Sequence, residues 1–252
     1  MKKFLYLVLL NIPILATAGN GLADSIFTKA NRLYQDGRYE EASMLYLGID
    51  SIGLQSAEVY FNAANAFFRS NKLGKARVYY EKALLLDPSD RDIRANLTYL
   101  ESMLADRFEE VPEFFLRTWI RSFFTLWHSN TWAVISLISF TLFLAGGFLY
   151  IFTRKPVIRK TGFYASIFFI FLSIVAFGVS KYNYRMTSEP GTAVIMEGSQ
   201  VVRSSPRTSG KELFILHLGT KVWLENELDG WYEIRITDGR KGWIPEATLE
   251  KI

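Results

Sequence analysis

The chain has 252 residues, no cysteine and two histidines. It therefore has no thiol nucleophile, no disulfide and no lipid-modified cysteine, and neither histidine has a companion at a metal-ligand spacing. The formal net charge of +4 comes from the N-terminus and the flanks of two apolar segments, while the remaining parts are weakly acidic. Binding to nucleic acid requires a basic surface, so this function is excluded.

The N-terminus has the pattern of a secretory signal peptide. Met1, Lys2 and Lys3 form a basic start, residues 4–15 are mostly apolar, and residues 16–18 form a small-residue cleavage site. We expect residues 1–18 to be a signal peptide that exports the chain. An uncleaved membrane anchor is the alternative.

One sequence pattern occurs twice in residues 23–90, with a period of 34 residues. Small residues, a turn residue and a tyrosine recur at matched positions: Ala30 and Ala64, Gly37 and Asn71, Ala42 and Ala76, Tyr46 and Tyr80. This period predicts tetratricopeptide (TPR) helix pairs, with alanines where backbones approach and Gly37 and Asn71 in left-handed turns. We expect two TPR repeats plus a capping helix in residues 23–105. A helical bundle with a chance repeat is the alternative.

The first helices of TPR repeats line a concave face that holds another protein. By register we predict that ten residues bind the partner there: Phe27, Asn31, Tyr34, Glu58, Phe61, Asn62, Asn65, Phe68, Arg69 and Arg94. Asn31 and Asn62 have the spacing of asparagines that hold a peptide carboxylate in chaperone-type TPR domains. Phe27, Asp92 and Asn96 stand where those domains have basic residues. The alternative is that the asparagines bridge helices within the stack.

Two long apolar segments follow, residues 132–152 and 162–180, and neither contains a charged residue. Each is long enough to cross a bilayer core of ~30 Å at ~1.5 Å per residue, so we predict two transmembrane helices. The intervening loop, residues 153–161, has no acid and is expected to determine the topology. By the positive-inside rule it is cytoplasmic because of four basic residues: Arg154, Lys155, Arg159 and Lys160.

Residues 106–131 connect the repeats to the first span. They contain a helix-breaking Pro112 and then many aromatic residues around Arg117 and Arg121. Aromatic and basic side chains together are typical of the lipid–water interface. We predict an aromatic interfacial helix in residues 106–131 that lies on the outer surface of the bilayer. A third, partial span is the alternative, although arginine in hydrocarbon is costly.

The C-terminal residues 190–252 consist of short alternating runs separated by turn residues, which predicts a small all-β barrel. We expect this barrel to be an independent domain, tethered by residues 181–191, with Trp231 at its centre. The spacing resembles the bacterial SH3-like (SH3b) family through VVRSSP at 201–206, LGTKV at 218–222, GWYEI at 230–234 and GRKGWI at 239–244. The proline-peptide motifs of eukaryotic SH3 domains are absent, so their ligand is not implied.

The order of these elements resembles BatE-like proteins, the TPR–SH3 members of the Bacteroides aerotolerance (Bat) operon group. The expected fold class is a multidomain membrane protein with an all-α TPR helical repeat, a transmembrane helical hairpin and an all-β SH3-like small barrel. The resemblance implies a bacterial inner-membrane location, with two spans and both soluble domains in the periplasm. It also implies neighbouring partners such as von Willebrand A-domain Bat proteins and a MoxR-type ATPase.

The sequence contains no catalytic triad, phosphate-binding loop, metal-ligand cluster or cofactor motif. We therefore expect a non-enzymatic adaptor without catalytic residues, metal or cofactor. It would bind partner proteins in the periplasm through its TPR groove and its SH3-like domain. The resemblance to BatE-like proteins implies that it does so in a Bat aerotolerance or stress complex. The alternative is a cell-wall anchor whose SH3b domain binds peptidoglycan.

Overall fold

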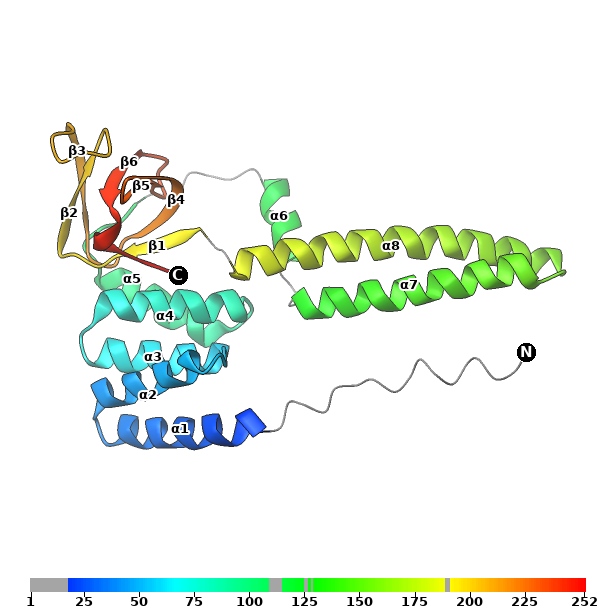
Figure 1. Cartoon of the computed structure of the whole chain (residues 1–252), viewed down its shortest axis with the longest axis horizontal. Helices are drawn as coiled ribbons and strands as arrows, with labels where there is room; N and C mark the ends of the chain where they lie inside the picture. The colour runs from blue at the N-terminus through cyan, green and yellow to red at the C-terminus, as the bar shows by residue number, and fades with distance from the viewer. Residues whose placement is uncertain (1–17, 109–114, 125–126, 128, 189–190) are drawn as a thin grey trace.

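The computed structural model describes residues 18–108, 115–124, 127, 129–188 and 191–252. It consists of an N-terminal helical TPR region, a long helical hairpin and a C-terminal antiparallel β-sheet domain of SH3-like type (Figure 1). The expected signal peptide lies outside the described residues, apart from Ala18, where the first helix begins. Figure 1 also shows the sheet domain against the α4 end of the repeat helices, with the hairpin projecting away.

The TPR region contains five helices: α1 (Ala18–Gln35), α2 (Tyr39–Ser51), α3 (Ala57–Arg69), α4 (Leu73–Leu86) and α5 (Arg91–Met103). The turns that end α1 and α3 are left-handed at Gly37 (φ 78°) and Asn71 (φ 60°), which confirms the expectation for these two positions. The capping helix α5 starts after Asp90, whose carboxylate accepts hydrogen bonds from the backbone N–H groups of Asp92 and Ile93.

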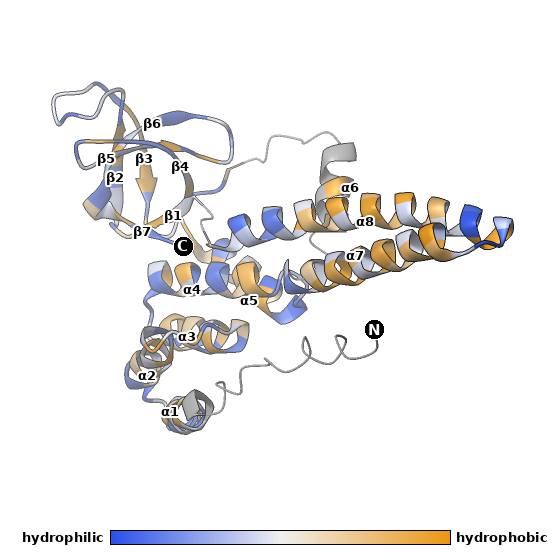
Figure 2. Cartoon of the chain, turned by 45° about the vertical axis from the view of Figure 1, so that its right-hand side comes forward, coloured by the Kyte–Doolittle hydropathy of each residue, from blue (hydrophilic) through white to orange (hydrophobic). Residues whose placement is uncertain are grey.

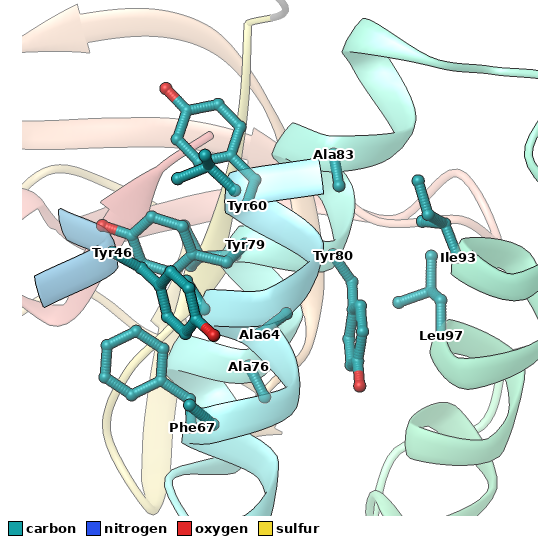
Figure 3. Packing of buried hydrophobic residues seen from close by; sticks show 14 of the residues in the cluster. Tyr46, Tyr60, Ala64, Phe67, Ala76, Tyr79, Tyr80, Ala83, Ile93 and Leu97 are labelled. Carbon is teal, nitrogen blue, oxygen red and sulfur yellow. The ribbon is translucent and has the colours of Figure 1, made fainter. Parts of the chain in front are cut away.

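The core of the TPR region is built mainly from small alanine and large tyrosine side chains. Ala30, Ala42, Ala64 and Ala76 are fully buried where helices approach. Tyrosine side chains fill the larger spaces between helices, and Figure 3 shows Tyr80 facing the helix that carries Ile93 and Leu97. The small residues therefore set the helix spacing, and the large residues fill what remains.

The hairpin consists of α7 (Ser129–Phe152) and α8 (Pro156–Ser188), two helices long and apolar enough to cross a membrane. Both are hydrophobic over most of their length in Figure 2. Ser136 and Ser173 each donate a hydrogen bond to the other's carbonyl oxygen at 3.0 Å. Arg159 and Lys160 lie in the first turns of α8, because this helix already begins at Pro156; the connecting loop is thus shorter than expected.

The segment between repeats and hairpin differs from the single expected helix. Only α6 (Phe115–Phe124) is helical among its described residues 106–108, 115–124 and 127. α6 exposes Phe115, Trp119 and Phe123 on one side. Its end is held at the hairpin by Asn183, whose Nδ2 donates to the carbonyl oxygen of Phe124 at 2.8 Å.

The sheet domain contains seven antiparallel strands in the order β3-β2-β6-β5-β4-β1-β7. Their bounds are β1 (Thr192–Ile195), β2 (Ser199–Arg203), β3 (Glu212–His217), β4 (Lys221–Leu228), β5 (Trp231–Arg235), β6 (Lys241–Pro245) and β7 (Leu249–Lys251), with a short 3-10 helix, η1 (Glu246–Thr248), before β7. On β5 the core face carries Tyr232 and Ile234, followed by Ile236, all buried. The choice of Trp231 as the central residue was wrong. Side chains alternate between the two faces of β5, and Trp231 belongs to the face opposite Tyr232 and Ile234, where it is only half-buried.

Candidate functional site

A groove of about 250 Å³ lies on the face formed by the first helices of the repeats. Its walls come from α1, α3 and α5, and one residue of α4 forms part of the floor. The lining residues are Tyr34, Asn65, Phe68, Arg69, Tyr80, Asn96 and Tyr99. A larger hollow of about 580 Å³ is lined by residues of α1 alone and is not enclosed between elements. The groove is therefore the better candidate for a binding site.

The floor of the groove is a hydrogen-bonded network around Asn65. Its Oδ1 accepts from the hydroxyl of Tyr80 at 2.6 Å and from Nδ2 of Asn96 at 2.9 Å. Burial raises the pKa of Tyr80 to about 12, and the hydrogen bond with Asn96 opposes this rise only partly. Tyr80 is therefore a neutral donor at physiological pH, and the network holds both amide side chains in fixed orientations.

These fixed amides suit a peptide backbone. An amide oxygen has two lone pairs, and both on Asn65 Oδ1 are used by Tyr80 and Asn96. A ligand can therefore meet an N–H of Asn65 and the carbonyl oxygen of Asn96. A donor and an acceptor side by side match the C=O and N–H groups of an extended peptide.

The walls of the groove add aromatic surface and one cation. Phe68 and Tyr99 pack edge to face with ring centroids 5.8 Å apart. Arg69 is the charged residue among the described residues that line the groove. Its Nη2 donates to the hydroxyl of Tyr39 at 3.0 Å, and its guanidinium carbon lies 5.2 Å from the centre of that ring. The groove thus offers an aromatic wall beside a positioned positive charge.

The structure brings four of the ten expected residues into this lining: Tyr34, Asn65, Phe68 and Arg69. The other six lie elsewhere. Asn31 Oδ1 accepts from the hydroxyl of Tyr46 at 2.5 Å, and the ring of Phe27 packs against Tyr46. Phe61 packs against Tyr80.

The remaining three expected residues are placed as follows. Glu58 is exposed and Asn62 is half-buried, both outside the groove lining. The Nη2 of Arg94 donates to the carbonyl oxygen of Pro88, which directs this side chain to the start of α5. Asn31, the first member of the expected asparagine pair, thus bridges two helices of the stack, as the alternative interpretation held.

Three lining residues were not among those expected: Tyr80, Asn96 and Tyr99. A signal for one of them was present in the sequence. Asn31 and Tyr46 have the same separation as Asn65 and Tyr80, so a repeated asparagine–tyrosine pair indicates a contact. Asn96 and Tyr99 belong to the capping helix, and nothing in their spacing distinguishes the groove side from the solvent side.

The four basic residues of the expected cytoplasmic loop lie at the far end of the hairpin from both domains (Figure 1). Arg154 and Lys155 occupy the connection, and Arg159 stacks on the ring of Tyr150 at 5.1 Å. Within the described residues, no group of three or more His, Cys, Asp or Glu side chains is placed to hold a metal ion.

Comparison with known families identifies two segments. Residues 57–90 match the model of the tetratricopeptide repeat, and residues 200–250 match that of the bacterial SH3 domain. The first match covers α3 and α4, and the second covers most of the sheet domain. No curated protein and no solved structure matches the chain. The chain thus contains a TPR repeat and a bacterial SH3 domain beside two long apolar helices.

Proposed function

We propose that this chain is a non-enzymatic membrane adaptor whose TPR groove holds an extended segment of a partner protein. The observation that carries the proposal is the groove floor, where Asn65 and Asn96 present both a donor and an acceptor. The aromatic wall formed by Phe68 and Tyr99 would pack against an apolar side chain of the partner, and Arg69 would pair with an acidic group. TPR and SH3 domains in general support protein or cell-wall binding.

The proposed location is the inner membrane of a bacterium, with α7 and α8 as its two spans. Two long apolar helices support this location, and the basic residues at their connection support a cytoplasmic loop. Both soluble domains would then lie in the periplasm. On the resemblance of the element order alone, we propose a Bat-type stress complex, with von Willebrand A-domain proteins as partners.

A photo-crosslinking amino acid can test the groove in living cells. Position Tyr99 lies in the groove and is 61% exposed, whereas Met44 lies on α2 outside the lining and is 66% exposed. We expect a protein adduct from position 99 and none from position 44. Arg69→Glu should abolish the adduct. Equal adducts at both positions, or an adduct that is unaffected by Arg69→Glu, would contradict the proposal.

A cell-wall anchor is the second candidate, supported by the bacterial SH3 match. Trp223, Trp231 and Trp243 are half-buried at the surface of the sheet and could stack on sugar rings. The test is co-sedimentation of the full chain, in detergent, with purified peptidoglycan. Sedimentation that Trp243→Ala abolishes and Arg69→Glu does not would favour this function over the first.

A further inference from the structure

Strand β1 is buried on both of its faces, which is unusual for a strand of a small antiparallel sheet. Ala193 and Ile195 belong to the core of the sheet domain. Val194, between them, belongs to the core of the TPR region and is fully buried there. Met196 and the C-terminal Ile252 also pack against the TPR core. One strand thus takes part in two hydrophobic cores.

The turn between β3 and β4 forms a second apolar contact with the TPR region. A Cβ atom placed on Gly74 of α4 would lie 2.9 Å from Cδ1 of Leu218. A Cβ atom on Gly219 would lie 2.7 Å from Cδ2 of Leu104, just after α5. Both glycines therefore lie in the contact between the two domains, and neither position has room for a larger residue unless the neighbour moves.

Polar contacts surround these apolar ones. The carboxylate of Asp106 accepts from the backbone N–H of His217 at 2.7 Å and from the hydroxyl of Thr220 at 2.6 Å, and it lies 2.6 Å from Nδ1 of His217. Glu81, which is 5% exposed, pairs with Lys221 at 2.6 Å. These bonds join residues more than 100 positions apart in the chain and satisfy charges that the contact removes from water.

We infer that the SH3 domain is a permanent member of the repeat stack, which closes the outer face of α4 in place of a sixth helix. A TPR stack that ends on the single helix α5 leaves α4 covered on one side only. Here β1 contacts α4, and Val194 of β1 belongs to the same buried cluster as Val78 of α4. The short chain between Ser188 of α8 and Thr192 of β1 separately limits how far the SH3 domain can move from the end of the hairpin.

This inference replaces the expected tethered barrel with a single rigid head. The expected tether, residues 181–191, is helical up to Ser188. The SH3 surfaces formed by β1, β7 and the β3–β4 turn are therefore occupied by the chain itself. A ligand of this domain can use only the remaining strands, and a partner of the TPR region cannot extend the stack beyond α5.

The absence of cysteine permits a clean test by spin labelling. Labels at Gln35→Cys and Thr208→Cys, both exposed, report the distance between the two domains in the full chain in lipid nanodiscs. We expect one narrow distance distribution. Gly74→Arg should broaden it by forcing Leu218 and Met196 apart from α4. The matched control is Gly48→Arg, a helical glycine of α2 with nothing within 4 Å of its Cβ position, which should leave the distribution narrow.

A broad distribution without the arginine substitution, or a narrow one with Gly74→Arg, would overturn the inference. If Gly74→Arg prevents folding, Asp106→Asn offers a milder disruption, with the exposed Asp36→Asn as its control. Hydrogen exchange gives the second readout. Asp106→Asn should speed exchange in β1 and α4 and leave α1 and α2 unchanged, whereas uniform acceleration would show general unfolding instead.

Discussion

The hydroxyl of Tyr80 on α4 donates to the amide oxygen of Asn65 on α3 at 2.6 Å. The same bond occurs between α2 and α1, where Tyr46 donates to Asn31 at 2.5 Å. Each bond ties two consecutive antiparallel helices together. The amide oxygen of Asn65 also accepts a hydrogen bond from Asn96 of α5. The bond that holds α3 and α4 together is therefore also part of the groove floor.

Tyr80→Phe should destabilise the TPR region by about 1 kcal/mol, because one buried hydrogen bond is lost while Asn96 still serves the Asn65 oxygen. Tyr46→Phe should cost at least as much, since its ring is 1% exposed and Asn31 loses the bond from Tyr46. Thermal unfolding of the full chain, followed by helical circular dichroism, measures both. Tyr99→Phe, at an exposed ring, serves as the control, and an equal loss there would contradict the assignment.

The TPR region should lose stability at alkaline pH through its buried tyrosines. Burial raises the pKa values of Tyr46, Tyr79 and Tyr80 from 10.0 to about 12. Above pH 10 the unfolded chain releases these protons and the folded chain keeps them, so the stability that is complete below pH 10 is lost as pH rises through 12. Ultraviolet titration should show these tyrosines ionising together with the loss of helix. Ionisation near pH 10 with the helices intact would refute this.

Acid should loosen the contact between the two domains. Burial by itself would raise the pKa of Asp106, but hydrogen bonds from Thr220 and His217 outweigh it and keep the pKa below the usual 3.8. The contribution of Asp106 is therefore present above pH 3.8 and is lost as pH falls through its lower folded-state pKa. The spin-label distance should broaden at low pH, and Asp106→Asn should already be broad at neutral pH.

The stability of the hairpin should be sensitive to substitution of Gly162 and insensitive to substitution of Gly178. A Cβ atom on Gly162 would lie 2.8 Å from the carbonyl oxygen of Gly146 and 3.0 Å from the backbone nitrogen of Tyr150. Gly162→Ile must therefore push α7 and α8 apart, at a cost of about 1–3 kcal/mol. Gly178→Ile is the matched control, because nothing lies within 4 Å of its Cβ position. Thermal melting in detergent should show a lower midpoint for Gly162→Ile alone.

The proposed topology predicts the behaviour of a reporter that is active only in the cytoplasm. Fused after Ile252, it should be silent, because the chain would end in the periplasm. Fused to a chain shortened after Lys155, in the basic connection, it should be active. Strong activity of the full-length fusion would refute the topology and, with it, a periplasmic partner.

Local patterns predicted the TPR helices through their 34-residue period, and the all-β character of the C-terminal domain through alternating runs separated by turn residues. Ala64 and Ala76 could be assigned to tight contacts, and Asn71 to a left-handed turn, from spacing alone. The sequence pattern did not identify the inner face of β5, since Trp231 and Tyr232 are both large and aromatic. The full extent of α8 was also missed, because its polar ends continue the helix beyond the apolar stretch.

The contact between the domains could not be predicted from local patterns. Asp106 meets His217 across 111 positions, and no period or motif connects them. The sequence around Val194 does contain one sign of this contact. β1 lacks the alternation of polar and apolar residues that a strand with one solvent-exposed face has. This sign indicates that both faces of the strand are covered, but not which part of the chain covers the second face. The four groove residues that were anticipated followed helix register, and those on α5 depended on how the last helix packs.

Four Cα steps separate the end of α8 at Ser188 from the start of β1 at Thr192. Such a chain spans at most roughly 15 Å. If α8 crosses the membrane, the SH3 domain cannot rise far above the bilayer, and the TPR groove, which is bound to it, has the same limited reach. The groove could then bind only segments that lie close to the lipid surface. Its natural partners would be proteins that present an extended segment next to the membrane, such as those anchored in the same bilayer.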